Sequence, residues 1–198
     1  MDNSELLEQL YQSHPESQKD DPGRLVRWTD LDQRSLQWQS RNEALGGMIA
    51  PGQTVLDVGC GTMALKSFLP EGCRYIPADI VKRSPECLVV DLNDGNFPTD
   101  LEEKIDVVVF SGVLEYLHDA EQALRWAAGM AETVLFSYAL LERNPDTQRR
   151  TVKSGFFNHF DEPALAAVIT GAGLEKLARA EWRKQSIFQT RQQPAPED

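Results

Sequence analysis

The chain has 198 residues and a formal net charge of −11, and 41% of its residues are hydrophobic while 26% are charged. This length suits one domain with its own core, and the composition is typical of a globular protein. The negative charge opposes the phosphate backbone of nucleic acids, so we expect no nucleic-acid partner. No apolar run reaches the roughly 18 residues of a membrane helix, and residues 1–10 contain no Lys or Arg, unlike a signal peptide. These features predict a cytoplasmic protein without a membrane partner.

The three cysteines, Cys60, Cys73 and Cys87, are odd in number and lack C-x-x-C spacing. A disulfide framework would pair its cysteines, and a zinc site would group them at short spacings. We therefore expect free thiols and no bound metal.

The N-terminal residues look peripheral. Residues 1–23 join a short helical pattern to a polar stretch with two prolines, which suits a mobile arm or lid and equally a frayed terminus. A helix is expected over residues 24–49, before Pro51 and Gly52 end it. We place a single domain at 24–191 and a disordered tail at 192–198.

From residue 54 onward, the pattern alternates strands and helices. Strands are predicted at 54–58, 74–77, 87–90, 105–110, 133–138, 174–182 and 186–190, and helices at 64–69, 120–130 and 162–172. Continuous apolar runs such as residues 107–109 are typical of parallel strands that are covered on both faces. The last two strands are close enough in the chain to form an antiparallel hairpin. The sequence therefore predicts a doubly wound, Rossmann-like α/β fold with a mostly parallel seven-stranded sheet that ends in this hairpin.

A glycine turn follows the first strand in residues 57–61, DVGCG. Glycines let a ligand approach the backbone, and a helix after the turn would present unpaired N–H groups. Asp79 stands twenty residues after Gly59, where a carboxylate can accept both ribose hydroxyls, and Asp91 ends the third strand, within reach of a base. Each acid alone would more often be a capping or turn residue. Together they predict a nucleotide-type site at the carboxyl edge of the sheet.

Residues 57–61 resemble the first motif of class I S-adenosylmethionine-dependent methyltransferases. Residues 111–117, SGVLEYL, resemble the segment after the fourth strand of that family, commonly written V-L-E-H-L. The resemblance covers roughly residues 41–189 and implies S-adenosylmethionine as the cofactor. Two positions depart from the family pattern: Met63 stands where many members have a third glycine, and Tyr116 replaces the His of V-L-E-H-L.

The resemblance also implies which residues meet each part of the cofactor. The contacts with the methionine moiety would come from Gly59, Gly61, Asp57, Ser111 and Gly112, with Asp57 orienting the amino group directly or through water. Asp79 would bind the ribose, and Asp91 with the backbone of Leu92 would meet the adenine.

The expected activity is methyl transfer to oxygen or nitrogen of a small-molecule acceptor, such as a metabolite, sugar or glycan precursor. A hydroxyl acceptor would profit from a general base. The candidates are His159, in an aromatic segment at 155–160, and His118, just after the fourth strand; Glu115 and Tyr138 are less favoured. The structural explanations are that His159 caps the next helix and that His118 is a surface residue.

Two other functions stay open. Residues 59–64 also satisfy the G-x-G-x-x-G/A pattern of an NAD-binding oxidoreductase, although Asp57 stands where dinucleotide folds usually keep an apolar residue. The chain could also bind the cofactor without catalysis, as a partner of another enzyme. The sequence leaves the oligomeric state open.

Overall fold

The computed structural model describes residues 38–95, 97–99 and 101–194. The predicted arm at 1–23, the first part of the helix predicted at 24–49 and the last four residues of the tail lie outside these ranges. Among the described residues, no helix is both long and apolar enough to cross a membrane.

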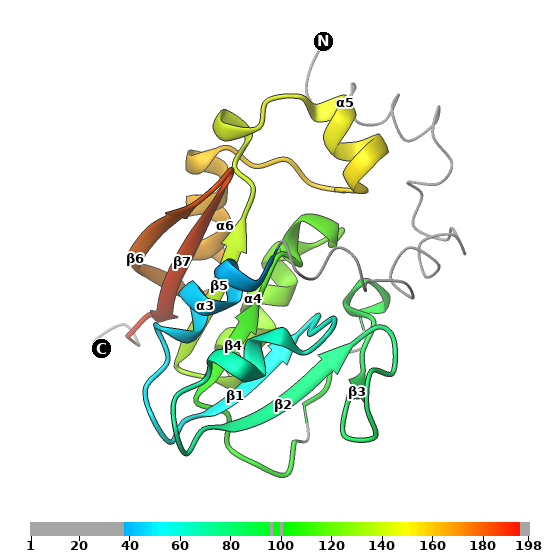
Figure 1. Cartoon of the computed structure of the whole chain (residues 1–198). Helices are drawn as coiled ribbons and strands as arrows, with labels where there is room; N and C mark the ends of the chain where they lie inside the picture. Colours follow the sequence, from blue (N-terminus) through cyan, green and yellow to red (C-terminus); the bar gives the residue numbers. More distant parts are fainter. Residues whose placement is uncertain (1–37, 96, 100, 195–198) are drawn as a thin grey trace.

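A seven-stranded sheet in the order β3-β2-β1-β4-β5-β7-β6 forms the centre of the molecule (Figure 1). The strands are β1 (Thr54–Val58), β2 (Arg74–Asp79), β3 (Leu88–Val89), β4 (Val107–Phe110), β5 (Thr133–Tyr138), β6 (Leu174–Trp182) and β7 (Gln185–Gln192). The first five strands pair in parallel, and β7 pairs antiparallel with both β5 and β6. The predicted fold class is therefore confirmed, including the terminal hairpin.

Helices cover both faces of this sheet. The α-helices are α3 (Gln39–Gly46), α4 (Ala120–Met130), α5 (Thr147–Arg149) and α6 (Glu162–Gly171). Short 3-10 helices are η3 (Ala64–Phe68), η4 (Leu92–Asp94), η5 (Leu114–Tyr116) and η6 (Leu141–Arg143), and η7 (Arg150–Ser154) is a π-helical turn. The helix predicted to reach residue 49 instead ends at Gly46, where it packs against η3.

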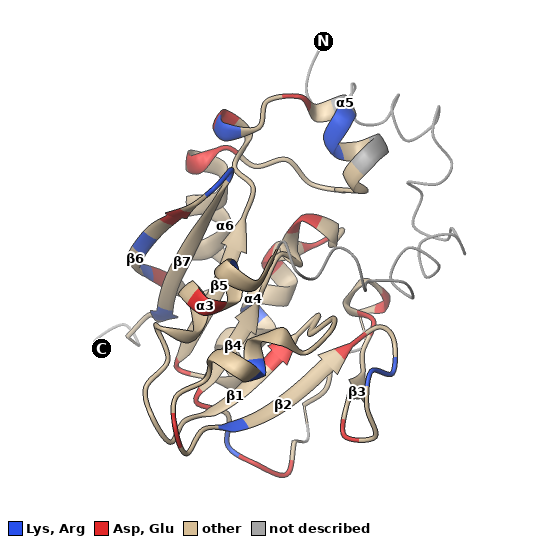
Figure 2. Cartoon of the chain, in the orientation of Figure 1, with Lys and Arg blue, Asp and Glu red and all other residues tan. Residues whose placement is uncertain are grey.

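The sheet separates two hydrophobic cores. Val108 and Phe110 of β4 face the larger core, which includes residues of α4 and α6, whereas Val107 and Val109 face the core under α3. All four residues of β4 are buried, which explains its continuous apolar run. The ribbons of β4 and β5 carry no charged residue (Figure 2).

The chain order of the sheet reverses at β1. From β1 the chain proceeds to β2 and β3 on one side, and later from β4 to β5 on the other. In open α/β sheets, ligands bind outside the carboxyl ends of the strands at such a reversal. The loops after β1 and β4 are therefore the natural place for a site.

The free state predicted for Cys60, Cys73 and Cys87 is confirmed.

Candidate functional site

The glycine turn after β1 is left-handed at three positions. Gly59 has a φ of 73°, Gly61 of 52° and Met63, at the third glycine position of the motif, of 59°. Met63 thus adopts a conformation that glycine would accept without strain. A Cβ at Gly59 would overlap Val113 of the loop after β4. The turn therefore needs glycine at its first position, and it brings the β1 and β4 loops into contact.

The short helix predicted at residues 64–69 follows this turn. It is the five-residue 3-10 helix η3. Gly46 of α3 packs so closely on Phe68 that a Cβ at Gly46 would overlap the Phe68 carbonyl. A dinucleotide pyrophosphate is held by the N-terminus of a regular helix after the glycine turn. Because η3 is too short to supply that site, the geometry argues against the NAD-binding alternative.

Asp57 lies in β1 with only 1% of its surface exposed. Its Oδ2 accepts a 2.7 Å hydrogen bond from the Tyr75 hydroxyl on β2, whereas Oδ1 is buried without a partner among the described residues. Burial raises the pKa of Asp57 from 3.8 to about 7, against the effect of the Tyr75 hydrogen bond. A buried acceptor oxygen without a donor is costly, and a ligand amino group would satisfy it.

Asp79 ends β2 and fixes the glycine turn. Its Oδ2 accepts a 2.8 Å hydrogen bond from the Gly61 amide, and its Oδ1 accepts one of 2.9 Å from the Val81 amide. The guanidinium of Arg83 lies 3.3 Å from Oδ1. A carboxylate offers about four acceptor sites, so Asp79 can still accept a hydrogen bond from a ribose hydroxyl. The predicted ribose contact stays a prediction.

Asp91 and Leu92 lie in the loop after β3. The Asp91 Oδ1 accepts a 3.0 Å hydrogen bond from the Asn93 amide, and Leu92 packs into the larger core. Asn93 joins this loop to the loop after β4, because its Nδ2 donates to the Tyr116 carbonyl at 3.0 Å and its Oδ1 accepts from the His118 amide at 2.8 Å. These hydrogen bonds join the two loops into one wall of the candidate site. The contacts of Asp91 and Leu92 with the adenine stay a prediction.

Arg41 of α3 is a site residue that the sequence analysis does not identify. Its Nε donates to Ser111 Oγ and its Nη2 to the Ser111 carbonyl, both at 3.0 Å. Its Nη1 donates to Gln185 Oε1 at 3.0 Å. Ser111 in turn donates to Asn42 Oδ1 at 2.5 Å. Arg41 therefore fastens α3 to the carboxyl end of β4 and to the start of β7.

The guanidinium of Arg41 is enclosed as well as bonded. It lies 5.5 Å from the ring centroids of both Trp38 and Trp182. It also occupies the space over Gly112, where a Cβ would overlap it. Burial lowers the pKa of Arg41, although the charge of Glu115 opposes this shift. A buried cation thus stands beside two of the residues predicted to contact the methionine moiety, Ser111 and Gly112.

The aromatic segment at 155–160 is hydrogen-bonded to η5. The Glu115 carbonyl accepts a 2.8 Å hydrogen bond from the Phe157 amide. Asn158 Nδ2 donates to two further carbonyls of the loop after β4, at 2.7 and 2.9 Å, while its Oδ1 accepts one of 2.5 Å from the Tyr138 hydroxyl. The segment therefore forms a fixed wall on the β4–β5 side of the site.

His159 makes contacts unlike those of a general base. Its Nδ1 accepts a 3.0 Å hydrogen bond from Arg150 Nε, and its Nε2 lies 3.0 Å from Thr151 Oγ1. Burial and the charge of Arg150 lower the pKa of His159 from 6.5 to about 4. Arg150 is fully buried and also donates to the carbonyls of Ala139 and Asn144, at 2.5 and 3.1 Å. Both ring nitrogens of His159 are therefore engaged with Arg150 and Thr151, which argues against the predicted role of His159 as a general base.

His118 is exposed at the end of the loop after β4. Its ring centroid lies 4.1 Å from that of Phe157, so it stands on the aromatic wall. Its role as a base stays a prediction.

The sequence matches a family model described as a methyltransferase domain over residues 30–179, well over half of the chain. The chain belongs to this methyltransferase-domain family. No curated protein matches the sequence.

Many solved structures share the fold of this methyltransferase domain. A chain from the complex between the Haloferax volcanii Trm112 methyltransferase activator and a methyltransferase is 15% identical, with a TM-score of 0.65. The match covers 85% of this chain and 95% of that one. The 1,6-didemethyltoxoflavin-N1-methyltransferase of Burkholderia thailandensis, with bound S-adenosylhomocysteine, is 19% identical (TM-score 0.60; 96% and 88% covered). An O-methyltransferase of neocarzinostatin biosynthesis, in complex with S-adenosylmethionine, is 24% identical (TM-score 0.55; 76% and 50% covered). At these identities the likeness establishes the fold.

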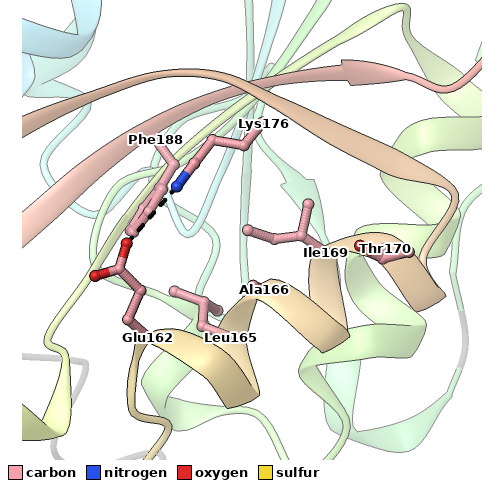
Figure 3. Close-up of a pocket in the computed structure, with 7 residues that line it drawn as sticks. All are labelled: Glu162, Leu165, Ala166, Ile169, Thr170, Lys176 and Phe188. Atoms are coloured by element: carbon pink, nitrogen blue, oxygen red, sulfur yellow. Dashed lines mark ion pairs between the residues drawn. The ribbon is translucent and has the colours of Figure 1, made fainter.

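The methyltransferase domain has a pocket away from the glycine turn, between α6 and the β6–β7 hairpin (Figure 3). Lys176 Nζ lies 3.6 Å from a Glu162 carboxylate oxygen at its rim, and Phe188 and Leu165 supply apolar lining. None of the predicted site residues lines it. Among the described residues, no group of three His, Cys, Asp or Glu side chains is placed to hold a metal ion.

Proposed function

We propose that this methyltransferase domain transfers a methyl group from S-adenosylmethionine to oxygen or nitrogen of a small-molecule acceptor. The observation that carries the proposal is the buried, unpartnered Oδ1 of Asp57, beside a glycine turn with two left-handed glycines. The cofactor has an α-amino group that would satisfy this oxygen. The absence of a regular helix after the turn fits a cofactor without phosphates.

Residues of the chain provide the charges that such a cofactor needs. Its amino-acid end is a zwitterion, and Arg41 and Asp57 are buried groups of opposite charge within electrostatic reach of each other. Asp57 would take the ammonium, and Asp79 a ribose hydroxyl. When bound, S-adenosylmethionine supplies a methyl group that is already activated on a sulfonium. The remaining work of the protein is to orient the acceptor and to exclude water.

A small acceptor is supported by the wall of η5 and the segment at 155–160. Tyr116 and Phe156 pack edge to face with centroids 5.1 Å apart, and Phe157 lies beside His118. Such an apolar wall suits a compact, partly aromatic molecule. The two solved methyltransferases described above carry small molecules of this kind, 1,6-didemethyltoxoflavin and a naphthoic acid.

Calorimetry with S-adenosylmethionine, S-adenosylhomocysteine and NAD tests the cofactor. We expect binding of the first two and none of NAD; the reverse, or no binding of any, would contradict the proposal. Incubation with labelled cofactor and pools of small metabolites, followed by mass analysis, then tests the transfer. Cofactor binding without product from any pool would favour the non-catalytic alternative.

A further inference from the structure

We infer that Glu115 is the carboxylate that receives the proton of the methyl acceptor, with Oε2 as the receiving atom. The inference rests on the proposed function. Glu115 is fully buried in η5, and its Oε1 accepts hydrogen bonds from the Ala139 amide at 2.8 Å and from Gln185 Nε2 at 3.2 Å. Its Oε2 is buried without a partner among the described residues.

The position of Glu115 agrees with this role. Val113, two residues earlier, packs against Gly59 of the glycine turn, so η5 starts at the cofactor loop. Ala139 follows the end of β5, and Gln185 begins β7 and accepts from Arg41. The carboxylate therefore lies at the carboxyl edge of the sheet, between the predicted methionine contacts and the aromatic wall.

A purely structural anchor would not need a carboxylate here. The hydrogen bonds from Ala139 and Gln185 both go to Oε1, which a glutamine would supply equally well without the cost of burying a charge; the amide of Glu115 itself also lies close enough to the carboxylate to lower its pKa. Among the described residues, no ion pair joins Glu115 to either Arg41 or Arg150, although both guanidiniums are within electrostatic reach. A buried carboxylate that keeps one oxygen unpartnered is a feature of functional sites.

The surroundings also favour proton uptake. Burial raises the pKa of Glu115, while hydrogen bonds from the backbone amides of Glu115 and Ala139, and then the charges of Arg41 from α3 and Arg150 from η7, oppose the rise. Tyr138 at the end of β5 also faces it, and the pKa of Tyr138 is raised, first by burial and then by the charge of Glu115. Tyr138 is therefore neutral whenever Glu115 titrates. A carboxylate of raised pKa holds a proton more firmly than an ordinary one, as a base requires.

Methyl transfer and the removal of the acceptor proton belong to one reaction. The heteroatom of the acceptor forms a bond to the methyl carbon, the carbon–sulfur bond breaks, and sulfur keeps its electron pair as a neutral thioether. The proton of the acceptor hydroxyl or amine passes to Glu115 Oε2, and solvent removes it after the product leaves.

The test uses two ligands that differ in charge at the transfer position. Sinefungin carries a C–NH3+ group in place of the S–CH3+ group of the cofactor, whereas S-adenosylhomocysteine has no charge there. If Glu115 faces this position, Glu115→Gln should lower the affinity for sinefungin by about 10- to 100-fold and leave the affinity for S-adenosylhomocysteine nearly unchanged. Glu132→Gln is the matched control, because Glu132 is exposed at the opposite end of β5; it should change neither affinity.

The wild type provides a second measurement that does not depend on the folding of a variant. The affinity of sinefungin relative to S-adenosylhomocysteine should fall on acidification, because protonation of Glu115 removes the charge that attracts the ammonium. Asp57 faces the common part of both ligands, so its titration cancels in the ratio. The inference would be overturned if the affinity ratio did not depend on pH. It would also be overturned if Glu115→Gln weakened the binding of both ligands equally, or if a folded Glu115→Gln variant bound sinefungin as tightly as the wild type does. If the wild type bound neither ligand, the proposed function itself would fail, and this inference with it.

Discussion

Replacement of Asp57 by Asn should make the ligand-free protein less sensitive to pH. The folded-state pKa of Asp57, about 7, lies well above its ordinary value of 3.8. A carboxyl with a raised pKa adds stability that is fully present below its unfolded pKa and is lost as pH rises through its folded pKa. From pH 8 to pH 5 the wild type should therefore gain about 3 kcal/mol from this group, roughly two pKa units of linkage, which Asp57→Asn lacks.

Urea unfolding of both proteins at pH 8 and pH 5 measures this difference. Other groups titrate in both proteins, so they cancel in the comparison. Tyr75→Phe is the control, because it keeps the carboxyl ionisable and removes the hydrogen bond that lowers its pKa. Its stability should rise on acidification at least as much as that of the wild type. Parallel pH dependence in the wild type and Asp57→Asn would refute the assignment of the raised pKa to Asp57.

Three further predictions concern the packing around the site. Gly112→Ala should destabilise the protein by more than about 1 kcal/mol, because the φ of 68° strains alanine and its Cβ would displace the Arg41 guanidinium; urea unfolding measures it, and unchanged stability would contradict it. Gly129→Ala, in α4 with open space around its Cβ, should instead stabilise by roughly 0.5–1 kcal/mol in the same assay. His159→Ala should cost about 1–3 kcal/mol by leaving Arg150 Nε unsatisfied, with S-adenosylhomocysteine affinity unchanged in calorimetry; a wild-type unfolding curve would show that the contact is dispensable.

The strands could be predicted from the sequence because their signal is local. Residues 54–58, 133–138 and 174–182 have the same bounds in the structure as in the sequence analysis. The short helix predicted at 64–69 is present as the 3-10 helix η3. The helix predicted to reach residue 49 ends instead at Gly46, where it packs on η3, a tertiary contact that the local sequence does not reveal.

The glycine turn could be predicted because residues 57–61 form a contiguous motif, and Asp79 and Asp91 because each follows a predicted strand. Arg41 could not be predicted, because its partners Ser111 and Gln185 lie 70 and 144 residues away and an arginine among polar helix residues suggests a solvated face. Tyr75 left a weak signal: an aspartate in a buried strand needs a donor, and Tyr75 on the neighbouring strand carries one. Nothing in the sequence indicated that His159 would be engaged at both nitrogens.

The site contains buried arginines and buried carboxyl groups. Arg41 and Arg150 are buried cations, and Asp57 and Glu115 are buried carboxylates, each within electrostatic reach of at least one of the others. A fold that used them only for stability would pair them directly, because an unpaired buried charge is costly. Among the described residues, however, the arginines bond to neutral acceptors, and each carboxylate keeps one oxygen unpartnered. This arrangement leaves two acceptor oxygens unpartnered at the carboxyl edge of the sheet, and we propose that one serves the cofactor and the other the molecule to be methylated.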